Sequence, residues 1–175
     1  MLALAVTPSS LHFAATSQFA TLGITTMLAI ESLVQDSQKL TALFGAWPSF
    51  HDAEVVDLHL WRGDVKPGDW DDRNVFPVVT ATLRVLGATQ SGATHSGHDV
   101  LVTLRFHDVD DFKMDRFDHI NMIFELSIST QERGTFTSGE RLPPYLIVNF
   151  EPSACIRMSF RCFRISVVDA VRCED

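Results

Sequence analysis

Several short segments of this chain alternate strictly between apolar and polar residues. A repeat of two residues is typical of a β-strand that buries one face, because successive side chains point to opposite sides of a sheet. The pattern runs through residues 53–62, 76–86, 100–107, 120–129 and 145–151, and residues 156–171 supply one long bent strand or two short ones. The residues expected to face the core are Val56, Leu58 and Leu60; Val79, Ala81, Leu83 and Val85; Val100, Val102, Leu104 and Phe106; Met122, Phe124, Leu126 and Ile128; Leu146, Val148 and Phe150; and Ile156, Met158, Phe160 and Cys162.

Residues 27–44 show helical spacing instead. Their apolar side chains recur near a helical period, at Ile30, Leu33, Val34, Leu40, Leu43 and Phe44. Thr26 could cap the start of this helix, Gly45 could end it in the left-handed conformation, and Pro48 prevents its continuation. The sequence therefore predicts a mainly β protein of the α+β class: an antiparallel sheet or sandwich of about six to seven strands, with one N-terminal amphipathic helix packed on it.

The first 26 residues differ from the rest because they contain no Lys, Arg, Asp or Glu. A secretory signal needs basic residues before an apolar stretch of about 7–15 residues, and Pro8, Ser9 and Ser10 interrupt the apolar residues here. We expect residues 1–26 to be a loose extension or the product of an over-early start codon, with a degenerate export signal as the alternative. Residues 27–175 are predicted to form a single domain, and no apolar run approaches the roughly 20 residues that span a membrane.

Acidic residues outnumber basic ones by 22 to 14, which gives a formal net charge of −8 at pH 7. Such a charge repels phosphates, so we expect no nucleic-acid partner; it suits a basic protein partner or simple solubility. Cys155, Cys162 and Cys173 lack C-x-x-C spacing, so neither a disulfide framework nor a zinc site is predicted. Reduced thiols are the expected state in a cytoplasmic protein.

The segment Trp47–Val55 joins the predicted helix to the first predicted strand. His51, Asp52 and Glu54 lie close enough in the sequence to be metal ligands or an acid–base group. Strand alternation, however, places the two carboxylates on the apolar face that also carries Val56, where they need hydrogen-bond partners. We therefore prefer a polar latch that fixes the turn between helix and sheet. The residues predicted to be structural in this segment are Trp47, Pro48, Phe50, His51, Asp52 and Glu54.

Other chemistry finds little support in the sequence. His95, His98 and Asp99 could form a metal cluster, but the loop that contains them is rich in Gly, Ser and Thr, and incidental composition is the preferred interpretation. The chain has no G-x-S-x-G nucleophile motif and no glycine-rich phosphate-binding motif. We predict no metal, no cofactor and no catalytic residue.

Carboxylates gather in two further segments. The first group is Asp69, Asp71 and Asp72 with Trp70 among them, and the second is Asp108, Asp110, Asp111, Asp115 and Asp118. Acidic side chains around an aromatic ring suit recognition of a basic protein, because the charges steer the encounter and the ring provides contact area. The alternative is that both segments are solvated loops. We take the two groups as the predicted partner-binding surface.

The Trp47–Val55 string, together with residues 101–106, 121–126, 148–152 and 160–162, resembles the bacterial immunity protein 50 family. The resemblance covers roughly residues 28–171; residues 1–26 have no counterpart, and residues 87–99 are an expected insertion. It implies a cytoplasmic antitoxin of a polymorphic toxin system, which binds a cognate toxin domain and blocks it without catalysis of its own. The activity of the toxin is not implied.

Two alternatives of other classes stay open at this point. One is a small metal-dependent, hydrolase-like enzyme that uses His51, Asp52 and Glu54, and the other is a protein-interaction domain unrelated to toxins. No membrane partner is expected, and the sequence does not indicate an oligomeric state.

Overall fold

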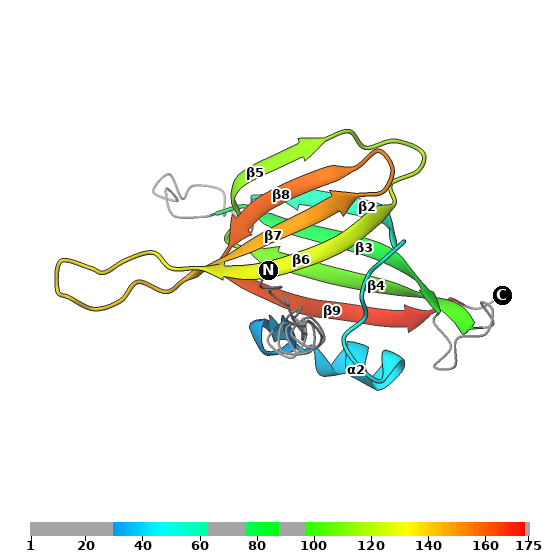
Figure 1. Cartoon of the computed structure of the whole chain (residues 1–175), viewed down its shortest axis with the longest axis horizontal. Coiled ribbons are helices and arrows are strands. Elements are labelled where there is room, and N and C mark those ends of the chain that lie inside the picture. Colours follow the sequence, from blue (N-terminus) through cyan, green and yellow to red (C-terminus); the bar gives the residue numbers. More distant parts are fainter. Residues whose placement is uncertain (1–29, 63–75, 88–96, 174–175) are drawn as a thin grey trace, which may run out of the picture.

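The described part of the chain, residues 30–62, 76–87 and 97–173 of a computed structural model, contains nine strands, the helix α2 and a helical segment at residues 30–33 (Figure 1). In chain order the strands and α2 are β1 (Val34–Gln35), α2 (Gln38–Phe44), β2 (Glu54–Trp61), β3 (Val78–Gly87), β4 (Gly97–His107), β5 (Asp110–Asp115), β6 (Ile123–Gln131), β7 (Tyr145–Pro152), β8 (Arg157–Cys162) and β9 (Arg164–Arg172). One sheet has the order β1-β9-β4-β3-β2 and the other β5-β8-β7-β6. Only β1 and β9 pair in parallel, so the predicted mainly β, antiparallel class is confirmed.

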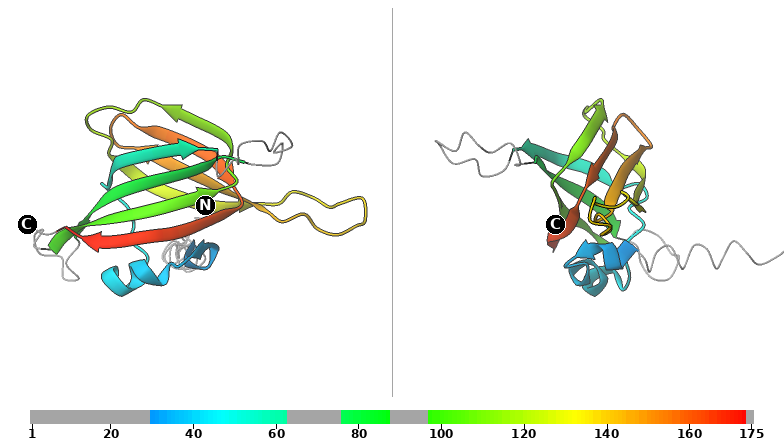
Figure 2. Two further views of the ribbon diagram at one scale, coloured as in Figure 1. Left: turned by 180° about the vertical axis from the view of Figure 1, so that it is seen from behind. Right: turned by 90° about the vertical axis from the view of Figure 1, so that its left-hand side faces the viewer.

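The two sheets face one another, as the two views of Figure 2 show, and they bury a shared apolar core between them. Phe106 of β4 contacts Phe160 of β8 edge to face, with ring centroids 4.9 Å apart, and lies 6.1 Å from Phe150 of β7. Because β4 belongs to one sheet while β7 and β8 belong to the other, these rings join the two layers.

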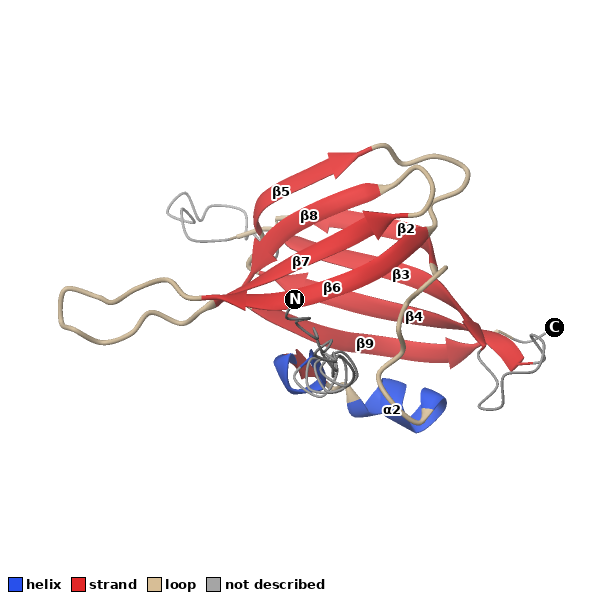
Figure 3. Ribbon diagram, viewed as in Figure 1, coloured by secondary structure: helices blue, strands red, loops and turns tan. Residues whose placement is uncertain are grey.

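The predicted alternation is confirmed in four strands. The predicted core residues of β3, β4, β7 and β8 are all buried. The segment 156–171 forms two strands, and β8 and β9 lie in different sheets (Figure 3). The chain therefore crosses between layers at Phe163, whose backbone N–H donates to the His107 carbonyl at 3.1 Å.

The prediction of one helix over residues 27–44 is wrong. Residues 30–33 are helical, but Val34 and Gln35 are extended and pair with β9, and Asp36 has a φ of 59° that breaks the helical path. The sheet offers Val34 a strand partner and a buried site, which outweighs its local helical periodicity. Helix α2 then ends as predicted at Gly45, which is left-handed. Thr26 and the predicted extension 1–26 lie outside the described residues.

Helix α2 lies along β9, at the edge of the five-stranded sheet (Figures 1 and 2). Leu40 is fully buried in the core. Lys39 Nζ donates to the carbonyls of Val167 at 3.0 Å and Val168 at 2.9 Å. The register between β4 and β9 shifts at this point, so Lys39 satisfies backbone groups at a β-bulge.

Two β-bulges overturn the predicted burial of Val56 and Leu60 in β2 and of Phe124 in β6, whereas Leu126 and Ile128 are buried as predicted and Leu58 is partly buried. The β2–β3 register skips Val56, and the β6–β7 register skips Phe124. An extra residue on one strand reverses the alternation of side chains from the bulge onward, so the residues on one side of it no longer follow the predicted phase. Val55 is consequently buried while Val56 is exposed, and Ile123 is buried while Phe124 is exposed.

Two strands absent from the prediction account for the count of nine rather than six or seven. One is the two-residue β1, and the other is β5, which was expected to be part of an acidic loop. Strand β5 pairs with β8 in an antiparallel register. Asp110 lies opposite Arg161, and Lys113 lies opposite Ser159. Strand β6 continues two residues beyond the predicted 120–129, and the chain then forms a hairpin that projects from the sandwich (Figure 1).

Candidate functional site

The Trp47–Val55 segment runs from the end of α2 to the start of β2 and is anchored on the core. Trp47 and Phe50 are buried, with ring centroids 5.6 Å apart in an edge-on contact. The Trp47 backbone N–H donates to Glu31 Oε1 at 2.8 Å, which ties the segment to the helical turn before β1. Two aromatic anchors and one charge-assisted hydrogen bond therefore hold this connection in place.

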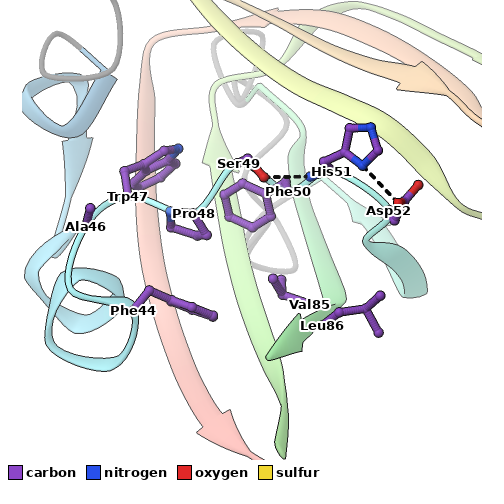
Figure 4. Close-up of a pocket in the computed structure, with 10 residues that line it drawn as sticks. All are labelled: Phe44, Ala46, Trp47, Pro48, Ser49, Phe50, His51, Asp52, Val85 and Leu86. Atoms are coloured by element: carbon purple, nitrogen blue, oxygen red, sulfur yellow. Dashed lines mark hydrogen bonds and ion pairs between the residues drawn. The ribbon is translucent and has the colours of Figure 1, made fainter. Parts of the chain in front are cut away.

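A pocket of about 290 Å³ opens beside this segment (Figure 4). Phe44 from the end of α2 borders one side, and Val85 and Leu86 from β3 border the other. The remaining lining residues all come from the connection: Ala46, Trp47, Pro48, Ser49, Phe50, His51 and Asp52. The pocket thus has an aromatic and aliphatic floor and a polar rim.

The polar rim is formed by His51 and Asp52. His51 Nδ1 lies 2.9 Å from Asp52 Oδ2, and the His51 backbone N–H donates to Ser49 Oγ at 3.3 Å. Both side chains are about half exposed, so the pair is open to solvent. On its other side, the His51 ring contacts the exposed ring of Phe124, with centroids 4.8 Å apart.

The same segment joins the two sheets through a short antiparallel ribbon. Val55 N–H donates to the Asn121 carbonyl at 2.9 Å, Ile123 N–H donates to the Ala53 carbonyl at 2.9 Å, and Glu54 pairs with Met122 between them. We call residues 53–56 and 120–123 the seam ribbon. Its position explains why the connection matters to the fold, since it closes one side of the sandwich.

The predicted placement of Asp52 and Glu54 on the core side is wrong. The bulge at Val56 turns Glu54 outward, where its Oε2 lies 2.7 Å from Arg84 Nη2 of β3. Glu54 therefore pairs with Arg84, while Asp52 pairs with His51. Among the described residues, which include all three, no three His, Cys, Asp or Glu side chains are grouped so that they could hold a metal ion.

The predicted acidic surface is only partly within the described residues. Asp110 Oδ2 lies 2.8 Å from Arg161 Nη2, and Asp111 Oδ2 lies 3.1 Å from Lys113 Nζ, so both carboxylates are paired across or along β5. Asp115 is exposed, and Asp108 is half-buried with a φ of 56°. The group at 69–72 lies outside the described residues, and the role of both groups stays a prediction.

The possible metal cluster of His95, His98 and Asp99 also lies only partly within the described residues. His95 lies outside the described residues, while Asp99 Oδ2 is 3.9 Å from Arg84 Nε and its carbonyl accepts a hydrogen bond from Cys173 N–H at 2.7 Å. Asp99 therefore helps to hold the end of β9 beside β4. His98 also has a partner in the structure.

The pair of His107 and Arg164, which the sequence did not single out, lies between β4 and β9 of the five-stranded sheet. Arg164 Nη2 donates to His107 Nδ1 at 3.0 Å, and His107 Nε2 lies 3.2 Å from Ser166 Oγ. Burial, then the charges of Arg164 and Arg105, lower the pKa of His107 below its usual value, although Asp108 acts in the opposite direction. An arginine donor on Nδ1 is compatible only with the neutral ring.

Comparison with known proteins adds one positive finding. A family model described as Immunity protein 50 matches residues 36–172, which is most of the chain and includes the Trp47–Val55 segment. A search of curated proteins and a search of solved structures gave no significant match. Within the described residues, no helix has the length and apolar character needed to cross a membrane.

Proposed function

Because the chain belongs to the immunity protein 50 family, we propose that it binds and neutralises a cognate toxin of a bacterial polymorphic toxin system without catalysis of its own. The observation that carries this proposal is the family match over residues 36–172, which spans α2 and every strand from β2 to β9. The proposed site of action is the cytoplasm, where reduced Cys155, Cys162 and Cys173 would persist.

The proposed mechanism is stoichiometric: the folded protein covers the active site of the toxin domain or holds that domain in an inactive conformation. A sandwich with a well-packed core can present a pre-organised surface, so little ordering entropy is lost on binding. The net charge of −8 favours a basic toxin surface and fast association at low ionic strength.

The acidic residues are the proposed steering surface. They are Asp69, Asp71 and Asp72, with Trp70 among them in the sequence, in the first group and Asp108, Asp110, Asp111 and Asp115 in the second. Steering predicts that replacing exposed Asp111 and Asp115 with Asn slows association more than it speeds dissociation. A surface plasmon resonance series at increasing salt would measure both rates.

Co-expression tests the proposed function directly. The toxin domain encoded beside the gene is expressed in a sensitive host, alone and together with this protein, and growth and co-purification are recorded. We expect growth to be restored and a stoichiometric complex to be recovered. If the protein does not restore growth against any toxin encoded beside its gene, and co-purifies with none of them, the proposed function is wrong.

The geometry of the motif gives the hydrolase alternative no specific support. His51 and Asp52 pair with each other at 2.9 Å, whereas Glu54 pairs with Arg84 at 2.7 Å. An acid–base or metal mechanism needs these groups to converge on a reacting atom. Metal analysis of purified protein, combined with Asp52→Ala, would detect such a site if metal bound stoichiometrically and left with the substitution.

A further inference from the structure

The seam ribbon has one buried face and one open face. On the inner face, Ala53, Val55, Asn121 and Ile123 are all buried in the core. Alternation then directs the residues between them outward, since successive side chains of an extended strand point to opposite sides. The open face is therefore defined by the same hydrogen bonds that join the two sheets.

Apolar side chains dominate the centre of this open face. Val56 and Ile120 are each 43% exposed, and Phe124, next to the ribbon, is 54% exposed. The antiparallel register that pairs Glu54 with Met122 and joins Val55 to Asn121, continued by one residue, brings Val56 beside Ile120. Both exposed positions, 56 and 124, arise from β-bulges, which aim these side chains away from the core.

The gathering of these residues is more informative than the exposure of each one. Single exposed apolar side chains are ordinary on a protein surface, but neighbouring ones rimmed by charges mark interaction sites. We call the set Val56, Ile120, Met122, Phe124 and His51 the seam patch. His51 connects it to the pocket of about 290 Å³, because its ring contacts Phe124 and also lines the pocket rim.

Negative charge surrounds the seam patch. Asp52 and Glu54 lie beside it, and Glu125, which follows Phe124, is exposed. Among the described residues, Arg84 is the cation that an ion pair holds at this rim. Its Nη2 lies 2.7 Å from Glu54 Oε2, so its positive charge is already neutralised. The rim therefore suits a basic surface with an apolar side chain at its centre, and it would repel a second copy of this acidic chain.

We propose that the seam patch is the surface on which the toxin domain docks, with an apolar side chain of the toxin held between Phe124 and the pocket and basic side chains on the carboxylate rim. This inference rests on the proposed function, since the occupant is the toxin domain. Buried aromatic contacts inside a charged rim carry most of the affinity in protein interfaces. The acidic residues of β5 would then steer the encounter, and the seam patch would hold the complex.

Two substitutions and a matched control test the proposal. Phe124→Ser and, independently, Ile120→Ser remove apolar area from the patch, and both side chains are exposed enough for the fold to be retained. Phe136→Ser is the control, because Phe136 is similarly exposed (49%) but lies on the projecting hairpin between β6 and β7. Circular dichroism melts check that each variant is folded.

Binding is measured with an inactivated form of the neighbouring toxin domain. We expect Phe124→Ser to weaken affinity by about 30-fold or more, mainly through faster dissociation, whereas the control stays within about threefold. If the wild-type protein does not bind, the proposed function fails. If the wild-type protein binds and both patch variants bind equally well, the function stands and the docking surface is wrong.

Sedimentation of the protein alone tests the competing occupant. We expect a species whose size is unchanged by Phe124→Ser. A dimer that Phe124→Ser converts to monomer would assign the seam patch to a second copy of this chain and overturn the proposal.

Discussion

Asn121 is the clearest point at which one side chain should control the stability of the seam. It is 4% exposed, the only polar or charged side chain that is buried among the described residues. Its Oδ1 accepts a hydrogen bond from Asp118 N–H at 2.8 Å, and its Nδ2 donates to the Asp118 carbonyl at 2.6 Å. Asn121→Ala removes both hydrogen bonds and leaves two backbone groups without their partner.

The expected loss follows from these two contacts. Each hydrogen bond contributes about 0.5–1.5 kcal/mol net, so two contribute about 1–3 kcal/mol, and incomplete hydration of the freed backbone groups adds to this. We expect Asn121→Ala to lower the free energy of unfolding by about 2–4 kcal/mol. Such a change is a large fraction of the stability of a typical domain.

Asn121→Asp tests the same two contacts through the pH dependence of the free energy of unfolding. One carboxylate oxygen can still accept from Asp118 N–H, but the other faces the Asp118 carbonyl and can bond to it only when protonated. Burial and this carbonyl should raise the pKa of the introduced group in the folded state. A raised pKa means that protonation favours folding, so the stability difference from wild type should narrow as the pH falls from 7 to 5.

Urea denaturation followed by circular dichroism at pH 5, 6 and 7 measures these differences. The matched control is Asn149→Asp, because Asn149 makes one long contact of 3.4 Å to Ser127 Oγ between β7 and β6, away from the seam ribbon. We expect the control to change stability little at any of these pH values. An Asn121→Ala protein as stable as wild type, or an Asn121→Asp difference that does not narrow on acidification, would refute this account of the seam.

Three further measurements test other contacts. Lys39→Met removes the donor to two carbonyls at the β9 bulge and should lower the free energy of unfolding by about 1 kcal/mol, while Lys113→Met should have less effect in the same urea titration. The pKa of His107 is lowered in the folded state, so the unfolded state binds more protons below about pH 6.5, and the stability of the wild-type protein should decrease as the pH falls through this range. Thermal melts between pH 5 and 7.5 should show a weaker pH dependence for His107→Gln. Burial raises the pKa of the Cys162 thiol to about 12. N-ethylmaleimide at pH 7 should therefore modify the other two cysteines and leave Cys162 unmodified until urea is added, and mass spectrometry measures this modification.

Strand alternation was a reliable guide wherever the predicted stretch of the strand carries no extra residue of its own. Strands β3 and β4 lie inside the five-stranded sheet, and their alternate residues from Val79 to Val85 and from Val100 to Phe106 are buried as predicted. The extra residues lie on the partner strands, Val56 on β2 and Val168 on β9, so the period of two persists along the predicted stretches of β3 and β4.

The same reasoning failed at Val56 and Phe124 for a physical reason. Strands β2 and β6 lie at sheet edges, where only the short seam ribbon pairs their outer side and a strand can accommodate a bulge. A bulge leaves no mark in apolar periodicity, because Val56 and Phe124 are themselves apolar and fit the wrong phase equally well. The error turned Glu54 inward in the prediction and concealed the exposed ring of Phe124.

The candidate site, too, could be predicted from the sequence only in part. The sequence by itself determined the mainly β class, the family to which the chain belongs and the importance of the Trp47–Val55 segment, because these depend on local order along the chain. Only the tertiary structure decided what surrounds that segment, since His51 and Phe124 are more than seventy positions apart and meet through long-range strand pairing. Local patterns report which face of a strand is apolar, whereas the partner across a seam depends on how the whole sandwich closes.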